Sequence, residues 1–229
     1  MALIDNLFDK NNGNYTIPLA IIPPEWQDYM NSIYSEPDPK EKIQTTTNRV
    51  SETIKCAILD SGIMTHHPLI KDEKRIVEIK DFTGEGIEDE SGHGTIVTLI
   101  TLLTLPSDFN IEFYIGKVLD KVGKGYEEEI LNGFRWAAKK GVDYINFSAG
   151  IERDYKCDGT CDFCISLKKI SEENRLIIIT AAGNKLEKYY CPAILDGKHH
   201  GIVATDSFSN SDFKRTTVYM PGEFVFVKI

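Results

Sequence analysis

The sequence predicts an α/β protein in which helices cover both faces of a mainly parallel sheet. From Ile54 onward, short apolar segments alternate with longer amphipathic ones, the order expected of strand–helix–strand units with right-handed crossovers. Residues 176–182 are almost continuously apolar, which is typical of a strand covered on both faces. The chain has 229 residues, of which 41% are hydrophobic, so it can bury a sizeable core.

The residues before the first buried strand are expected to form a separate arm. Residues 1–50 have a mixed character, and their polar end is expected to link them to the main domain at 51–229. Within the arm, Pro24 predicts the start of a helix that ends before Glu36, because proline is favoured in the first helical turn.

Six segments are expected to be the strands of the sheet, because each has ordinary strand length and is rich in apolar residues. Their boundaries are 54–59, 75–82, 111–118, 142–148, 176–182 and 201–205. The second alternates with charged residues, and we expect it to be an edge strand or ribbon.

Three segments, 94–103, 127–140 and 164–174, are expected to be helices. The first is apolar on most sides, so we expect it to be buried. The second is amphipathic, and Gly141 follows it as a natural stop.

Composition excludes several classes of function. A net charge of −9 argues against a nucleic-acid partner, since phosphate binding needs a basic surface. No apolar run approaches the ~20 residues that cross a bilayer, and no signal peptide is visible. The five cysteines are an odd number without an export signal, so reduced thiols and a cytoplasmic location are expected.

Two polar residues stand at the ends of apolar segments where catalytic groups are expected. Asp60 directly follows a buried strand, and His93 lies between two glycines at the start of an apolar helix. Open α/β sheets build their sites at the carboxyl ends of strands. A carboxylate there can fix the tautomer of a histidine base, which in turn can activate a hydroxyl nucleophile.

Further motifs surround this pair. They are Asp60-Ser61-Gly62, Asp89 with Gly92-His93-Gly94-Thr95, Val142 to Gly150, Thr180-Ala181-Ala182-Gly183-Asn184 and Met220-Pro221-Gly222. With these motifs, and with aspartate before histidine, the chain resembles the subtilisin-like serine proteases, or subtilases of the peptidase S8 type, over roughly 54–222. The resemblance implies a three-layer subtilisin-like fold and an endopeptidase that cleaves polypeptides without a catalytic cofactor.

The resemblance also implies a role for each matching residue. Asp60 would orient His93, and His93 would be the general base and then the general acid. Asn184 would donate its side-chain amide to the oxyanion. Ser148, Ala149 and Gly150 would form the strand edge that pairs with an extended peptide substrate.

The nucleophile of the family is not found in the sequence. It lies in a Gly-Thr-Ser-x-Ala-x-Pro motif beyond the turn matched by Met220, and the sequence ends at Ile229 without one. Ser207, Ser209 and Ser211 are expected to be loop residues. We therefore expect that the C-terminal part of the fold is missing and that the chain alone is inactive.

Three explanations stay open at this point. The chain is a truncated or interrupted protease, a pseudoprotease that binds peptides, or a half-enzyme completed in trans by a segment or chain that carries the serine. Because Asp60, His93 and Asn184 are all retained, a long-inactive site is disfavoured.

A cysteine cluster departs from the family pattern. Cys157, Cys161 and Cys164 follow the predicted substrate strand, and Cys191 comes later. Four thiolates can form a closed, structural zinc site. Another metal, free or disulfide-forming thiols, and an iron–sulfur cluster are the alternatives, and the surrounding fold argues against the cluster. Cys56 lies in a strand and is expected to be a small hydrophobic residue.

Overall fold

The computed structural model describes residues 19–21, 53–105, 110–153, 157–183, 188–207, 218–220 and 225–227. The chain divides into two compact units, one made of 1–50 with 221–229 and one made of 51–220. In the first unit, β1 (Leu19–Ile21) pairs antiparallel with β11 (Val225–Val227). The helix predicted to begin at Pro24 lies outside the described residues.

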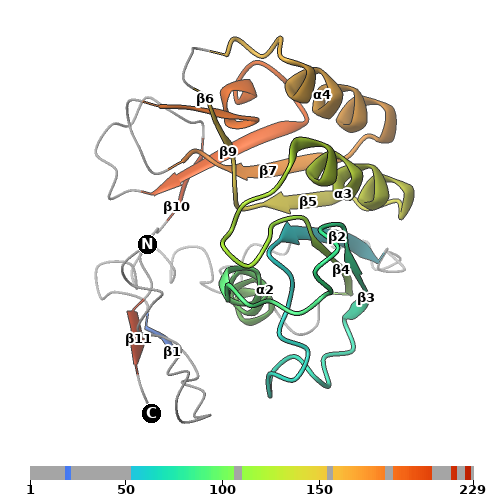
Figure 1. Ribbon diagram of the computed structural model, residues 1–229, viewed down its shortest axis with the longest axis vertical. Helices are drawn as coiled ribbons and strands as arrows, with labels where there is room; N and C mark the ends of the chain where they lie inside the picture. Colours follow the sequence, from blue (N-terminus) through green and yellow to red (C-terminus); the bar gives the residue numbers. More distant parts are fainter. Residues whose placement is uncertain are drawn as a thin grey trace, which may run out of the picture. The chain divides into compact units, whose positions relative to one another are not determined.

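The larger unit contains a sheet of seven parallel strands (Figure 1). The strands are β2 (Ile54–Asp60), β3 (Ile76–Asp81), β4 (Ile111–Lys117), β5 (Tyr144–Phe147), β7 (Ile177–Ala181), β9 (Ile202–Ser207) and β10 (Val218–Met220). Their order is β10-β9-β7-β5-β2-β4-β3, and every neighbouring pair is parallel. The predicted α/β class with a parallel sheet is therefore confirmed, and β3 lies at an edge.

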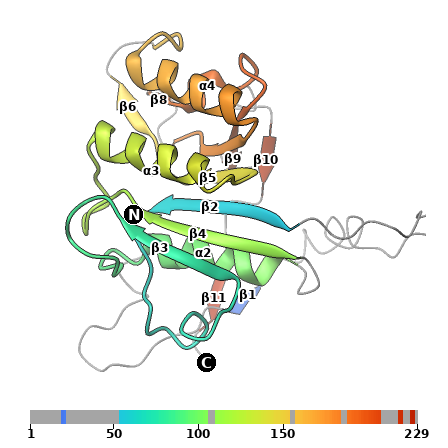
Figure 2. The same ribbon diagram turned by 90° about the vertical axis from the view of Figure 1, so that its right-hand side faces the viewer.

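Helices lie on both faces of this sheet. They are α2 (His93–Thr104), α3 (Glu127–Lys139) and α4 (Asp162–Asn174). Both views show α3 and α4 side by side (Figures 1 and 2). Because side chains alternate along β2, Ala57 and Leu59 join the core formed with α3 and α4, whereas Ile58 joins the core formed with α2. The result is the expected three-layer arrangement.

The expectation that α2 is buried on most sides holds for residues 94–102, which are buried or half-buried, and fails only at its end. Leu99 and Leu102 are buried, but Leu103 is 58% exposed.

The order of the strands reverses at one place in the sheet. The chain runs from β2 to β3 and β4 on one side of β2, and then crosses to β5 on the other side. Ligands of open α/β sheets bind outside the carboxyl ends of the strands where the order reverses, which here means β2 and β5. Asp60 is the last residue of β2 and stands at this point.

Several short elements were not predicted from sequence, among them two strands and a 3-10 helix next to the sheet. β6 (Ile151–Arg153) pairs antiparallel with β8 (Tyr189–Cys191), and a short 3-10 helix, η1 (Ala193–Leu195), follows β8. We refer to the β6–β8 pair as the ribbon. It continues directly from the segment after β5, so it borders the same end of the sheet.

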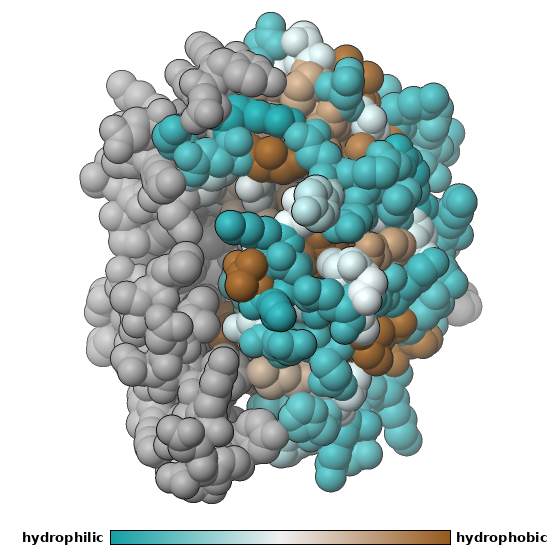
Figure 3. Space-filling model, in the orientation of Figure 1, coloured by the Kyte–Doolittle hydropathy of each residue, from teal (hydrophilic) through white to brown (hydrophobic). Residues whose placement is uncertain are grey.

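One face of the described part is mostly polar. On the face seen in Figure 3, hydrophilic residues predominate over the described part, with apolar residues scattered among them. Within the part of the chain that the structure describes, no helix has both the length and the apolar character needed to cross a membrane.

Candidate active site

Asp60 and His93, which are 33 residues apart in sequence, meet at the carboxyl end of β2. His93 Nδ1 lies 2.7 Å from Asp60 Oδ1, and the same oxygen accepts the backbone N–H of Ser61 at 2.8 Å. An ionised carboxylate only accepts hydrogen bonds, so Nδ1 carries the proton and Nε2 is left as the basic nitrogen. The Asp60 side chain is fully buried, whereas that of His93 is 39% exposed and accessible to a reactant.

The surroundings of His93 favour its protonated form. Its pKa is raised above 6.5, chiefly by the hydrogen bond to Asp60, while burial opposes the shift. The negative charges of Asp60 and Asp89 add to the rise in pKa. The site is therefore organised to stabilise an imidazolium, the species that forms when a histidine takes a proton from a nucleophile.

Asp89 holds the start of the helix that carries His93. Its Oδ2 accepts the backbone N–H of Thr95 at 2.8 Å and the Thr95 hydroxyl at 2.7 Å. Its Oδ1 accepts the backbone N–H of Gly92 at 2.8 Å. The carboxylate thus satisfies first-turn donors that have no partner within the helix, and it carries the charge that a helix N-terminus favours.

The Ser61 hydroxyl joins the end of β2 to the start of α2. It donates to Asp89 Oδ1 at 2.9 Å and accepts from the Ser91 hydroxyl and the Gly94 backbone N–H, each at 2.9 Å. Neither Ser61 nor Asp89 was among the predicted site residues. An acidic residue just before a helix start is a sequence signal that could have indicated the capping role of Asp89.

Gly94 allows α2 to approach the end of β2. A Cβ atom at this position would lie 2.4 Å from the Gly62 carbonyl oxygen and 3.1 Å from Asp60 Cβ. The first turn of α2 is therefore in direct contact with the turn after β2, and any side chain at position 94 would move His93 away from Asp60.

Lys117 is a buried cation beneath this turn. It ends β4, is paired in register with Asp60, and is fully buried. Its Nζ donates to the Glu88 carbonyl oxygen at 2.8 Å and lies 3.8 Å from Glu85 Oε2. Lys117 thereby fastens the segment that leads to Asp89. The sequence pattern did not predict this role, although it places a lysine at the end of an apolar strand.

The predicted substrate-binding residues follow the strand next to the one that ends at Asp60. Ser148, Ala149 and Gly150 directly follow β5, which ends at Phe147, slightly before the predicted strand end. The Ala149 carbonyl accepts the Thr180 hydroxyl at 3.0 Å, which fixes the segment against β7. These residues stand at the carboxyl edge of the strand next to β2.

Two other sets of predicted residues are only partly described. Asn184, the predicted oxyanion donor, lies outside the described residues, and the chain is described up to Gly183 just after β7. Ser207 was expected in a loop, but it is the last residue of β9 and pairs with Met220. This strand extends further than the apolar pattern indicated because β10 supplies a partner for its polar end.

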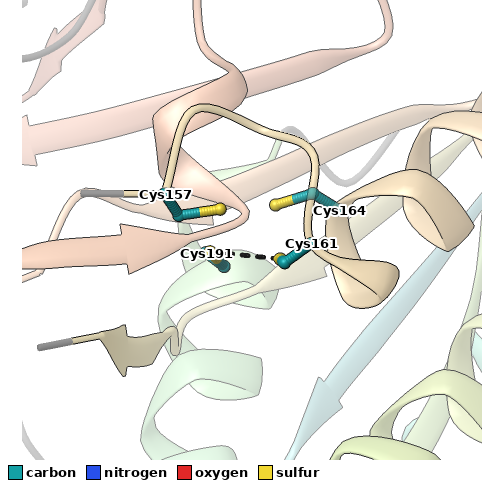
Figure 4. Close-up of side chains that lie close together, drawn as sticks. All are labelled: Cys157, Cys161, Cys164 and Cys191. Carbon is teal, nitrogen blue, oxygen red and sulfur yellow. Dashed lines mark hydrogen bonds between the residues drawn. The ribbon is translucent and has the colours of Figure 1, made fainter. Parts of the chain in front are cut away.

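The four clustered cysteines converge, as Figure 4 shows. The sulfur atoms of Cys157, Cys161, Cys164 and Cys191 all lie within 4.8 Å of one another. None of the five cysteines forms a disulfide. Cys56 lies apart from the cluster in β2, and burial, helped by the charge of Asp143, raises its pKa to about 12.

The parallel sheet and the paired carboxylate and imidazole at its switch point define a subtilisin-like α/β protein. Comparison of sequences leads to the same class: the sequence model of the Subtilase family matches residues 51–223. The chain belongs to the subtilase family.

Individual relatives agree with this assignment. The chain is 32% identical over 204 residues to the "Major intracellular serine protease" of Bacillus subtilis, an alignment that covers 75% of this chain and 59% of the relative. It is 28% identical over 144 residues to the "Intracellular serine protease" of Paenibacillus polymyxa, covering 58% and 42%. The chain thus spans less than two thirds of the length of these relatives.

A solved structure of a lanthipeptide protease has a similar fold. The TM-score is 0.53 at 21% sequence identity, and the match covers 67% of this chain and 48% of that chain.

The close contact at Gly94 predicts the sign of a stability change. Helix propensity alone would make Gly94→Ala stabilising by roughly 0.8–1.0 kcal/mol. The backbone contact at 2.4 Å should reverse this, and we expect the free energy of unfolding to fall by about 1–3 kcal/mol. Urea unfolding of the two proteins measures the difference. A more stable variant would show that α2 does not press against the turn after β2.

The His93–Asp60 hydrogen bond predicts a pKa that NMR can measure. In the wild-type protein His93 should titrate above 6.5, and Asp60→Asn should lower that value because the carboxylate charge is removed. The raised pKa adds stability that is fully present below about pH 6.5 and is lost as the pH rises through the folded-state value.

His67 provides an internal control in the same spectra. Burial is the main cause that lowers its pKa below 6.5, with a contribution from the charge of His66. Its titration should be unchanged by Asp60→Asn. A His93 pKa at or below 6.5 in the wild-type protein would contradict the described contact.

Proposed function

We propose that this chain supplies the aspartate and histidine of a serine endopeptidase, and that a segment outside these 229 residues supplies the nucleophile. The observation that supports this proposal is the 2.7 Å contact between His93 Nδ1 and Asp60 Oδ1. It fixes the ring by one nitrogen and leaves Nε2 as a base. The membership of the subtilase family and the serine protease names of the relatives agree with it.

The reaction would follow from these groups once a serine is present. His93 Nε2 would take the hydroxyl proton as the serine oxygen attacks the peptide carbonyl, and would then give that proton to the leaving amine. Water would hydrolyse the acyl-enzyme by the same route in reverse. Asp60 would stabilise the imidazolium in both steps, and Asn184 would donate to the oxyanion.

The substrate we propose is an extended polypeptide. Ser148, Ala149 and Gly150 would offer their backbone as a strand edge beside the reacting carbonyl, so that main-chain hydrogen bonds give affinity. Two relatives are named intracellular proteases, and this supports a cytoplasmic location. With a net charge of −9, nucleic acid is not a partner that we propose.

The missing serine motif favours a second candidate function, which is peptide binding without cleavage. The sequence contains no Gly-Thr-Ser-x-Ala motif, so without a completing segment the site would bind a peptide and release it intact. In that case the chain would be a peptide-binding pseudoprotease. One labelling experiment separates this function from the endopeptidase.

The test is labelling by a fluorophosphonate serine probe. The purified 229-residue chain should not label, and addition of a polypeptide that carries the serine motif and the nucleophile helix should restore labelling. Asp60→Asn should reduce the labelling rate of the completed protein by roughly 10⁴-fold, the scale of loss expected when the histidine tautomer is no longer fixed.

Ser207→Ala is the control, because Ser207 lies on β9 and should have no part in labelling. Labelling of the chain alone would overturn the proposal that the nucleophile comes from outside. Peptide binding without labelling in the completed protein would favour the pseudoprotease.

A further inference from the structure

We propose that Cys157, Cys161, Cys164 and Cys191 bind one zinc ion, and that this ion fastens the ribbon to the N-terminus of α4. The site is separate from the Asp60–His93 pair, and its tests do not depend on catalysis. The four residues come from three places in the chain: the loop before α4, the start of α4 and the end of β8.

The spacing of the sulfur atoms fits a single tetrahedral ion. Zinc–sulfur bonds of ~2.3 Å in a tetrahedron place the sulfurs roughly 3.8 Å apart. The Cys161 and Cys191 sulfurs are 3.8 Å apart, and all four lie within 4.8 Å of one another. The side chains point toward a common centre (Figure 4).

The same spacing disfavours the alternatives. A disulfide requires a sulfur–sulfur distance of ~2.05 Å, so Cys161 and Cys191 would have to move together. An iron–sulfur cluster attaches its thiolates to different iron atoms, which spreads the sulfurs further apart than ligands of one ion. An all-sulfur tetrahedral set suits zinc, which has no redox chemistry to require an open position.

The start of α4 is arranged for thiolates. Cys161 is the N-cap of α4, and Cys164 lies in the first turn of that helix. A negative sulfur at this end of a helix is stabilised by the free backbone donors and by the helix dipole. Cys157, Cys164 and Cys191 are buried, so the site is closed to substrate and its role is structural.

An arginine offsets the charge of the proposed centre. Four thiolates on one zinc ion carry a net charge of −2. The Nη2 of Arg153, on β6, lies 4.0 Å from the Cys161 sulfur, and its Nη1 lies 2.8 Å from Glu127 Oε1. The Arg153 side chain is 17% exposed, so its charge is only weakly screened by water.

Because of where the ribbon lies, an ion bound to it would also hold residues of the candidate active site in place. Cys191 is paired with Ile151, which directly follows Gly150. Tyr190, the residue before Cys191, lies over Gly183, where a Cβ atom would be 2.2 Å from the tyrosine ring. By holding β8, the ion would fix both the proposed substrate edge and the segment that leads to Asn184.

Binding is a coordination step without oxidation or reduction. Zinc binds to deprotonated sulfurs, and each thiol that binds releases its proton to solvent. Because the ligands are brought together only by the fold, metal binding should stabilise the folded chain.

The test is the metal content of the full 229-residue chain, purified under reducing conditions without a metal-affinity step. Elemental analysis should find one zinc ion per chain. Cys161→Ala should lose the zinc, and it removes the ligand that is least buried of the four. Cys56→Ala is the matched control, since Cys56 lies outside the cluster, and it should keep one zinc ion per chain.

A second measurement holds even if Cys161→Ala fails to fold. Cobalt exchanged into the wild-type protein should give the visible absorption of a tetrahedral site, together with sulfur-to-cobalt charge transfer. A chelator should lower the melting temperature of the wild-type protein. Five reactive thiols with no bound zinc, a disulfide between Cys161 and Cys191, or iron in place of zinc would each overturn the proposal.

Discussion

The structure depends on the contact between the end of β2 and the first turn of α2, where two carboxylates are buried side by side. The Asp60 side chain is fully buried, and Asp89 is 2% exposed. A buried carboxylate without partners is strongly destabilising. Here Asp60 accepts hydrogen bonds from His93 and from the backbone N–H of Ser61. Asp89 accepts hydrogen bonds from the first turn of α2 and from the Ser61 hydroxyl. Stability and the geometry of the candidate site therefore rest on the same hydrogen bonds.

The surrounding fold follows from this constraint. The helix start can reach the carboxyl end of β2 because Gly94 leaves room for backbone contact. Gly62 leaves room for the Ile87 carbonyl, and Lys117 holds the same segment before Asp89. The reversal of strand order then brings β5, and with it the proposed substrate edge, beside the same carboxylate. The ribbon follows directly after the proposed substrate edge. The proposed metal would hold the ribbon in place and would take no part in catalysis.

Much of this arrangement could be predicted from sequence. The buried strands and α3 show clear apolar patterns, and the motifs around Asp60 and His93 indicated both the family and the pair that meets in space. These features are local, because each is set by a few neighbouring residues. The parallel order of the strands followed from their alternation with helices.

Other features could not be predicted, because they depend on partners distant in sequence. β6 and β8 have three residues each, too few for a periodic signal, and only their pairing makes them strands. That pairing also brings Cys191 to the other three cysteines, a proximity that their spacing left open. The bridging role of Ser61 depends on an aspartate 28 residues away.

The most direct test of the central claim is the tautomer of His93, read from the nitrogen-15 chemical shifts of its ring at a pH where the ring is neutral. The described contact requires the proton on Nδ1, facing Asp60, and an unprotonated Nε2. Shifts that report this tautomer are the expected result. A neutral ring with its proton on Nε2 would contradict the account, because His93 would then neither bond to Asp60 as described nor be able to act as the base.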